Sequence, residues 1–366
     1  MTTHQRQAFI DWMKALGMLL IVIGHVIGSP DHMFNEMTQP IYTKQLGVAF
    51  FIFIMGWSLA NDRGPWLKVV FNRLFPVYFY GIAMALIMSV INWFAIGDIS
   101  ESNYLPFFAG VNVLFDFFPA NPSTWYIGTY FHVLLFWALI LRHVKLTPWL
   151  MLAGMIFEIG FRAVLISLDI QTIAYMVLPN WLSVFLLGYW FSSSRDQGIS
   201  LAAGGLFGVW ALLLTGWALF FNGFDLDAGF PFRSVPHERT GLTIALQSGV
   251  ISLVYFVNTW LCFQLCRLLW ASALIALIAR NTLLVFIIHM PVIYGFSNAF
   301  YSLFEHRETA QIVWIVVVFV GLTLLSEVIT RTLRITVIRD ALWKFLSPWL
   351  EKLPFNTGQP LHKDRT

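Results

Sequence analysis

Charged residues are scarce in this chain. Of its 366 residues only 11% are Asp, Glu, Lys or Arg, whereas 58% are hydrophobic and the mean hydropathy is +0.72. A soluble domain carries about 25% charged residues, so the scarcity of charge excludes a water-soluble globular protein. The 16 Trp and 35 Phe suit lipid contact and anchoring at the membrane interfaces. The composition therefore predicts an all-α integral membrane protein.

Cysteine is almost absent. Cys262 and Cys266 are the only two, four residues apart in one apolar segment. This spacing excludes a disulfide framework, and two thiols without nearby His or Asp make a poor metal site. We interpret both as packing residues and expect no metal.

The sequence also lacks a cleavable signal peptide and internal repeats. Its first apolar region has no small-residue cleavage site and is interrupted by charges. We expect one polytopic membrane domain over residues 1–352, followed by a short polar cytoplasmic tail over residues 353–366.

About ten segments are long and apolar enough to cross a bilayer, which takes about 20 residues of helix. Residues 98–123 are too broken by Gly, Asn and Pro to span, so they predict a re-entrant or interfacial segment. Residues 271–279 predict a short interfacial helix before the ninth span. The expected spans are 8–28, 44–61, 74–97, 124–142, 148–168, 172–192, 200–221, 241–266, 281–300 and 310–331.

The basic residues predict the orientation of these spans. Ten spans place both termini on one side, and with that side cytoplasmic most Lys and Arg lie in the inner loops, as the positive-inside rule requires. The outer side then holds only Lys44, Arg233, Arg239 and Arg307. We expect both termini to be cytoplasmic.

The first span contains three ionisable residues in the stretch DWMKALGMLLIVIGH, residues 11–25. At about 100° per residue, Asp11, Lys14 and His25 share one helix face. Lys14 lies near the cytosolic interface, and His25 lies about 16 Å further along the axis, past the middle of the membrane. Asp11 is about 21 Å from His25 along the axis, so it cannot orient that ring.

Ionisable groups within a membrane mark functional sites, and imidazole suits proton transfer near neutral pH. His25 is therefore our candidate general base, and Asp11 and Lys14 on the same face are further candidate residues of the catalytic site. Alternatively, Asp11 and Lys14 form an interfacial i,i+3 pair, and His25 bonds to a neighbouring helix.

The chain resembles the acyltransferase-3 family of integral membrane acyltransferases in several motifs. A basic residue, ten further residues and a His end the first span, as in that family. Three departures are Met55 in place of a usual Ser, Val70 in place of the first of two arginines, and no Arg-Pro after the late Glu. The other similar motifs are AFFIFIMGWSLA (49–60), WLKVVFNRLFPVYF (66–79), STWYIGTYFHVLLFW (123–137), NTLLVFIIHMPVIYG (281–295) and LLSEVITR (324–331).

The resemblance implies an enzyme that moves an acyl group, usually acetyl, from cytosolic acetyl-CoA or another acyl-CoA to a hydroxyl of a cell-envelope glycan. The chain resembles the stand-alone members, which carry no fused extracytoplasmic domain. The expected location is the plasma membrane, in bacteria the inner membrane. The expected partners are the lipid bilayer and a glycan or lipid-linked sugar acceptor, with no nucleic acid; the oligomeric state stays open.

The donor phosphates need cations at the inner mouth. Lys68 and Arg73 could supply them, with Lys14 further in, because guanidinium binds phosphate through two N–H groups. The alternative is ordinary positive-inside charge. His25 would then remove the acceptor's proton during direct transfer. Glu327 is a candidate to orient His25, although an i,i+4 pair with Arg331 is the simpler reading.

Four more features carry a candidate role beside a structural one. Glu158 and Arg162 form an i,i+4 pair inside the fifth span. His289 is a candidate substrate-binding residue or second base, or a structural His bonded to the carbonyl that Pro291 frees or to a neighbouring helix. Trp125 and Tyr126 form either an aromatic belt or a platform for a sugar ring, and His132 faces the same way.

Two other functions fit parts of the pattern. A proton-coupled transporter or flippase of a lipid-linked sugar could use His25, Lys14 and the Glu158–Arg162 pair as a polar relay, although the inverted repeats of such proteins are missing. The other major family of membrane-bound O-acyltransferases has its active His late in the chain, where His289 could serve.

Overall fold

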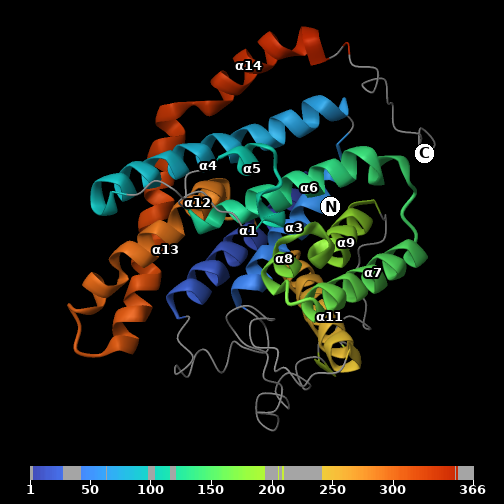
Figure 1. Ribbon diagram of the computed structural model, residues 1–366, viewed down its shortest axis with the longest axis horizontal. Coiled ribbons are helices and arrows are strands. Elements are labelled where there is room, and N and C mark those ends of the chain that lie inside the picture. Colours follow the sequence, from blue (N-terminus) through green and yellow to red (C-terminus); the bar gives the residue numbers. More distant parts are fainter. Residues whose placement is uncertain are drawn as a thin grey trace.

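The computed structural model describes residues 3–27, 43–62, 64–97, 104–115, 121–193, 205, 208–209, 241–350 and 352. Within these ranges the chain is helical, with no strand (Figure 1). The α-helices are α1 (Thr3–Val26), α3 (Thr43–Ala60), α4 (Trp66–Ile96), α5 (Leu105–Phe108), α6 (Trp125–Leu139), α7 (Pro148–Ser167), α8 (Gln171–Met176), α9 (Leu182–Ser193), α11 (Gly241–Cys266), α12 (Ala273–Tyr301), α13 (Arg307–Leu333) and α14 (Ile335–Leu350). The short 3₁₀ turns are η2 (Asn112–Leu114), η3 (Pro122–Thr124), η4 (Leu141–His143) and η5 (Leu178–Trp181).

Seven helices in the described ranges are long and apolar enough to cross a membrane, and a shorter apolar helix covers Gln45–Ala60. The protein is a multi-pass, all-α membrane protein. The expected span 172–192 is broken into α8, η5 and α9, with Pro179 inside the intervening 3₁₀ turn. The expected span 200–221 and the tail 353–366 fall almost wholly or wholly outside the described residues. The count of ten and the side on which the termini lie stay predictions.

The expected short interfacial helix at 271–279 is wrong. Residues from Ala273 onward belong to α12, which runs unbroken to Tyr301. Arg280 and Asn281 interrupt the hydropathy of this segment, which is why the sequence suggested two elements. Their side chains bind Glu327 on α13, so the polar groups are satisfied and the helix continues.

The spacer 98–123 forms no helix long enough to span in its described parts. It consists of α5, η2 and η3, and Phe107 and Asn112 within it are buried. The Gly97 residue at the end of α4 has φ 71°, a left-handed conformation that glycine adopts without strain and that ends a helix.

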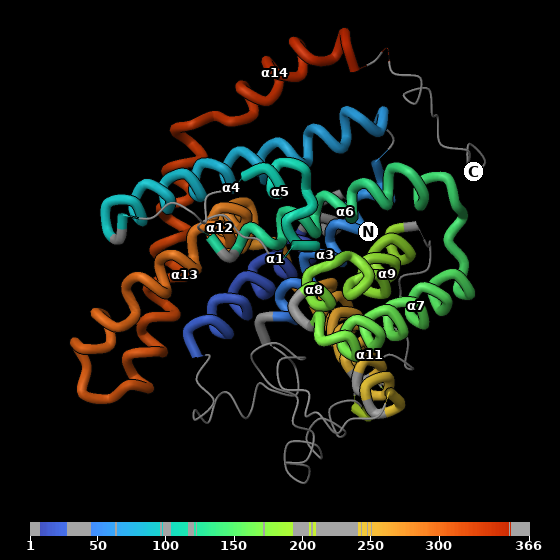
Figure 2. The backbone as a smooth tube through the Cα atoms, in the orientation of Figure 1, coloured from blue at the N-terminus to red at the C-terminus, as the bar shows by residue number. Residues whose placement is uncertain are grey.

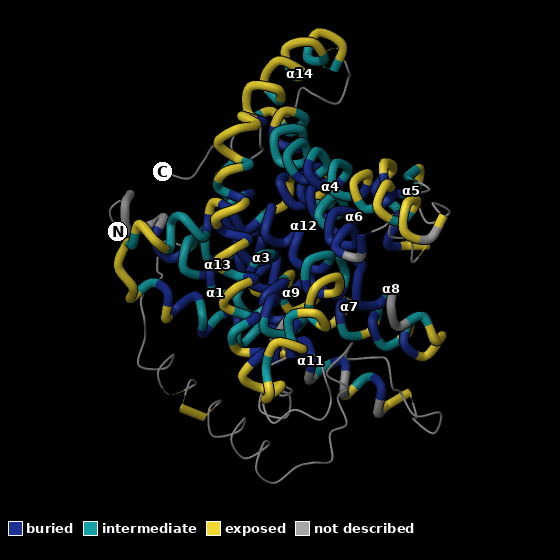
Figure 3. The backbone as a smooth tube through the Cα atoms, turned by 90° about the vertical axis from the view of Figure 1, so that its left-hand side faces the viewer, coloured by how far each residue is buried: buried dark blue, intermediate teal, exposed yellow. Residues whose placement is uncertain are grey.

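The centre of the bundle is held by two crossings at glycines. A Cβ at Gly47 of α3 would overlap the backbone of Gly17 on α1, and a Cβ at Gly188 of α9 would overlap the Phe53 carbonyl on α3. Helices in membranes approach this closely only where small residues face each other. Figure 2 traces α1, α3 and α9 side by side, and Figure 3 shows the buried residues gathered around them.

The last helix, α14, follows α13 after a single residue. Arg334 between them has φ 40° and turns the chain. The α14 helix then lies along α4, where the rings of Phe71 and Trp343 are 5.0 Å apart (Figure 1). Its packing adds a second layer outside α4, away from the residues considered next.

Candidate active site

A cavity of about 280 Å³ brings together residues from α1, α3, α4, α6 and α12. It holds two of the expected donor-binding cations, Lys14 and Arg73. Apart from these cations its wall is aromatic and aliphatic, with a few hydroxyls. The lining residues are Lys14, Phe51, Ile54, Met55, Ser58, Arg73, Pro76, Val77, Tyr126, Tyr130, Thr282, Leu283 and Phe286.

Arg73 is held in place by groups that the sequence did not single out. Its guanidinium donates to Ser58 Oγ at 2.8 Å and to Asp62 Oδ2 at 3.2 Å. The hydroxyl of Tyr130 interacts with the same guanidinium. Ser58 lies in the last turn of α3, and Asp62 lies two residues beyond the end of that helix. The only signal in the sequence was that both polar residues follow the apolar run of α3, a few positions before Arg73.

Lys14 faces the same cavity from α1 and interacts electrostatically with Asp11 and Arg73. Asp11 is half-buried one turn earlier, so the expected association of Asp11 with Lys14 is present as a charge interaction. Lys68 lies differently. It is exposed near the start of α4 and is not part of the cavity wall.

His25 lies at the other end of α1, beside two aromatic residues of α12. Its ring centroid is 5.0 Å from that of His289 and 6.4 Å from that of Tyr294. The Tyr294 hydroxyl is 3.5 Å from His25 Nδ1, at the outer limit of a hydrogen bond. His289 was an expected site residue, whereas Tyr294, five positions further on, was missed.

The ring of His289 is fixed by its own helix. Nδ1 bonds the carbonyl of Phe286, and because a carbonyl only accepts, Nδ1 carries the hydrogen. In the neutral ring Nε2 therefore holds the lone pair. Nε2 is buried and has no hydrogen-bond partner among the described residues. This leaves a buried acceptor next to His25.

The carbonyl that Pro291 frees is used by another residue. It belongs to Ile287, and the side chain of Asn121 donates to it at 2.9 Å. The expectation that His289 bonds this carbonyl is wrong. His289 bonds the carbonyl of Phe286, the residue before Ile287, and Asn121 binds that of Ile287. Asn121 is itself buried, and its side-chain oxygen accepts from the Ser123 N–H in η3, the turn before α6.

A row of rings separates the cavity from His25. The Tyr126 and Phe286 centroids are 5.0 Å apart, and those of Phe286 and His289 are 5.5 Å apart. Tyr126 and Phe286 belong to the cavity wall, and His25 and His289 do not. The lining of this cavity therefore reaches Phe286, and among the described residues neither histidine belongs to it.

Trp125 and Tyr126 do not form an interfacial belt. Each is only 8% exposed, and Trp125 packs against Tyr126 and Tyr175. The belt interpretation is therefore wrong. Tyr126 faces the cavity, and Trp125 supports it from behind.

Residues 7–331 match the family model described as "Acyltransferase domain" of the acyltransferase-3 family. The chain belongs to this family. Searches of curated proteins and of solved structures each gave no match. The protein is therefore a membrane acyltransferase, and the motifs that suggested the family supply the cavity and the pair of histidines described above.

Glu327 of this acyltransferase binds cations near the ends of α12 and α13. Its carboxylate accepts from Arg280 at 2.6 and 2.8 Å, from Asn281 at 2.7 Å and from Arg331 at 2.7 Å. The expected pair with Arg331 is confirmed. Asn281 precedes His289 by eight residues, about 12 Å along α12, so Glu327 lies too far away to orient His25.

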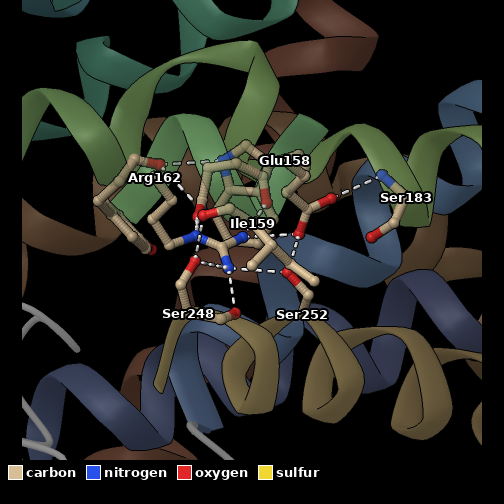
Figure 4. Close-up of polar contacts among 9 residues, drawn as sticks. Glu158, Ile159, Arg162, Ser183, Ser248 and Ser252 are labelled. Carbon is tan, nitrogen blue, oxygen red and sulfur yellow. Dashed lines mark hydrogen bonds and ion pairs between the residues drawn. The ribbon is translucent and has the colours of Figure 1, made fainter. Parts of the chain in front are cut away.

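Glu158 and Arg162 form the centre of a closed polar network (Figure 4). Their side chains are fully buried and pair at 2.6 Å. Glu158 also accepts from the Ser183 N–H and the Ser252 hydroxyl, at 2.7 and 2.6 Å. Arg162 also donates to Asn180, to Ser252 and to the Ser248 carbonyl.

This network joins α7, η5, α9 and α11 and borders neither the cavity at Lys14 nor the histidines. A second, apolar cavity of about 580 Å³ lies between α7, α9 and α11, and the network residues are not among its lining either. A relay needs groups that exchange protons with water or substrate. The many partners of both charges favour a structural role, and neither residue lines the cavity at Lys14, as a relay through that cavity would require.

Proposed function

We propose that this membrane acyltransferase moves a short acyl group, acetyl in the simplest case, from cytosolic acyl-CoA to a hydroxyl of a cell-envelope or exported glycan. The observation that carries the proposal is the arrangement along α1. Lys14 faces a cavity that also holds Arg73, and His25 lies about 16 Å further along the same helix, against His289.

The donor binds at the cation end. Phosphates of acyl-CoA contact Lys14 and Arg73, and Asp62 and Ser58 aim the guanidinium. Charge-assisted hydrogen bonds to phosphate are the strongest that a side chain offers. Asp11 keeps a carboxylate one turn before Lys14. Lys68, exposed at the start of α4, attracts the donor only weakly, because water screens its charge. The aromatic and aliphatic wall, Tyr126 included, holds the less polar arm of the donor.

The transfer takes place at the histidines. His25 removes the proton of the acceptor hydroxyl as its oxygen attacks the thioester carbonyl carbon. The carbon–sulfur bond breaks, and the protonated His25 returns the proton to the leaving thiolate of CoA. The lone pair of His289 Nε2 accepts a hydrogen bond from the acceptor and holds it beside His25.

The decisive experiment substitutes the two histidines separately. We expect His25→Ala to abolish glycan acylation while the protein still accumulates in the membrane. His289→Asn keeps a donor for the Phe286 carbonyl but loses the acceptor at Nε2, so we expect it to reduce the rate with some activity left. The control is His132→Ala, a half-buried histidine of α6 outside the cavity wall.

Acylation is measured by mass spectrometry of envelope polysaccharides and by release of CoA thiol in membranes. Full activity of the His25→Ala protein would exclude it as the base. The reverse result, with His289 essential and His25 dispensable, would place the base on α12 instead.

A further inference from the structure

The wall that closes the cavity toward the histidines consists of two rings, Tyr126 of α6 and Phe286 of α12. Phe286 is the only described residue that both lines the cavity and makes a ring contact with His289. Along α12 it follows Thr282, also in the cavity wall, by about 6 Å and precedes His289 by about 4.5 Å. The rings of Tyr126 and Phe286 therefore lie between the cavity and the histidine pair.

We propose that Phe286 and Tyr126 form a size filter that decides which acyl groups reach His25 from the donor cavity. This inference rests on the function proposed above and names the part of the site that sets donor specificity. The acyl end of the donor contacts the rings of Tyr126 and Phe286, so each methylene added to the acyl chain needs space between these two rings. In a closely packed apolar site, one methylene changes the relative rate by about 10- to 200-fold.

The two rings are held firmly enough to act as a filter. Both are more than nine-tenths buried. Tyr126 is backed by Trp125, whose ring in turn contacts Tyr175. The turn of α12 that follows Phe286 is fixed where Asn121 binds the Ile287 carbonyl. A longer acyl group therefore displaces packed side chains rather than loose ones, which costs free energy.

The cavity offers a matched control residue. Phe51 of α3 lines the same cavity from the opposite side, where its ring lies near Gly17 of α1. It makes no ring contact with Tyr126 or with either histidine among the described residues. Shortening Phe51 enlarges the cavity by as much as shortening Phe286 does, but away from the path to His25.

The experiment compares acetyl-, propionyl- and butyryl-CoA as donors in inside-out membrane vesicles from cells that make the protein, with release of CoA thiol as the readout. We expect Phe286→Ala to raise the ratio of butyryl to acetyl kcat/KM by about 10-fold or more. Tyr126→Leu should raise it in the same direction, and Phe51→Ala should leave it within about two-fold. Phe286→Leu tests the same point if the alanine variant does not accumulate.

An unchanged ratio in the Phe286 and Tyr126 variants would overturn the filter and leave the proposed function intact. An equal rise in Phe51→Ala would also overturn it, because cavity volume and not the position of the rings would then set the ratio. Failure of the unaltered protein to use any of the three donors would instead overturn the proposed function, and the filter with it.

Discussion

At the scale of single residues, the sequence predicted the positions on α1 better than their partners. The spacing of Lys14 and His25 on one helix depends only on helix geometry, and the two residues do lie at the cavity and at the histidine pair. The partners come from distant segments. Asn121 binds a carbonyl 166 residues away, a contact that no local pattern encodes.

Arg73 and Lys68 differ in their surroundings although they are close in sequence. Both are basic residues just before the third expected span, and only the apolar run after Arg73 distinguishes them in the sequence. The fold separates them because Arg73 faces inward to Ser58 and Asp62, whereas Lys68 is exposed. This difference leads to a prediction.

Arg73→Ala should raise the KM for acyl-CoA by about 10- to 100-fold, since hydrogen bonds to a charged group contribute about 1.5–3 kcal/mol. Lys14→Ala should act in the same direction. The matched control is Lys68→Ala on the same helix, for which we expect less than about a two-fold change because its charge is screened by water. Steady-state kinetics with varied acyl-CoA measures the KM of all three variants. Equal effects for Arg73 and Lys68 would mean that the donor phosphates bind at the start of α4 and not in the cavity.

At the scale of elements, hydropathy located most helices but not the start of α12. Arg280 and Asn281 look like a boundary in sequence, and only Glu327, on the next helix, makes them compatible with a continuous helix. The Glu158–Arg162 pair was visible as an i,i+4 spacing. Its completion by Ser183, Asn180, Ser248 and Ser252 depends on how α9 and α11 pack against α7.

The network predicts a stability effect without a direct catalytic effect. Glu158→Gln leaves the Arg162 charge buried and uncompensated, which costs about 3–5 kcal/mol. Replacing both partners with leucine should cost less, because neither charge then stays buried. Thermal unfolding in detergent measures the loss, and the rate per folded molecule should stay close to that of the unaltered protein.

The control for this prediction is Asp340→Asn, which breaks the partly exposed pair with Arg339. Such a surface pair contributes about 0–1 kcal/mol, so the unfolding temperature should hardly move. If Glu158→Gln kept its stability but lost its activity, the network would have a role in proton transfer after all.

At the scale of the whole molecule, composition predicted a helical membrane protein, and the fold confirms that class. The sequence could not foresee that the sixth expected span is interrupted at Pro179, because mean hydropathy does not register a break between two short helices. The direction of the chain across the membrane rests on the distribution of Lys and Arg alone.

Sidedness can be measured with single cysteines. We expect a membrane-impermeant maleimide to label Glu305→Cys, in the loop between α12 and α13, from outside, and Lys68→Cys only from the cytosolic side. The native Cys262 and Cys266 are buried or half-buried with their sulfurs 3.8 Å apart, so background labelling should be low. The opposite pattern would invert the orientation and place the donor cavity on the wrong side for cytosolic acyl-CoA.

The bond from Asn121 to the Ile287 carbonyl has a mechanical consequence. It joins the segment just before α6 to the turn of α12 next to Phe286. The two helices that carry the rings of the proposed filter are therefore linked to each other. While this hydrogen bond is present, α6 and α12 cannot move far apart near the rings. Passage of a donor then requires both helices to move together, so we expect the turnover rate to fall steeply on cooling.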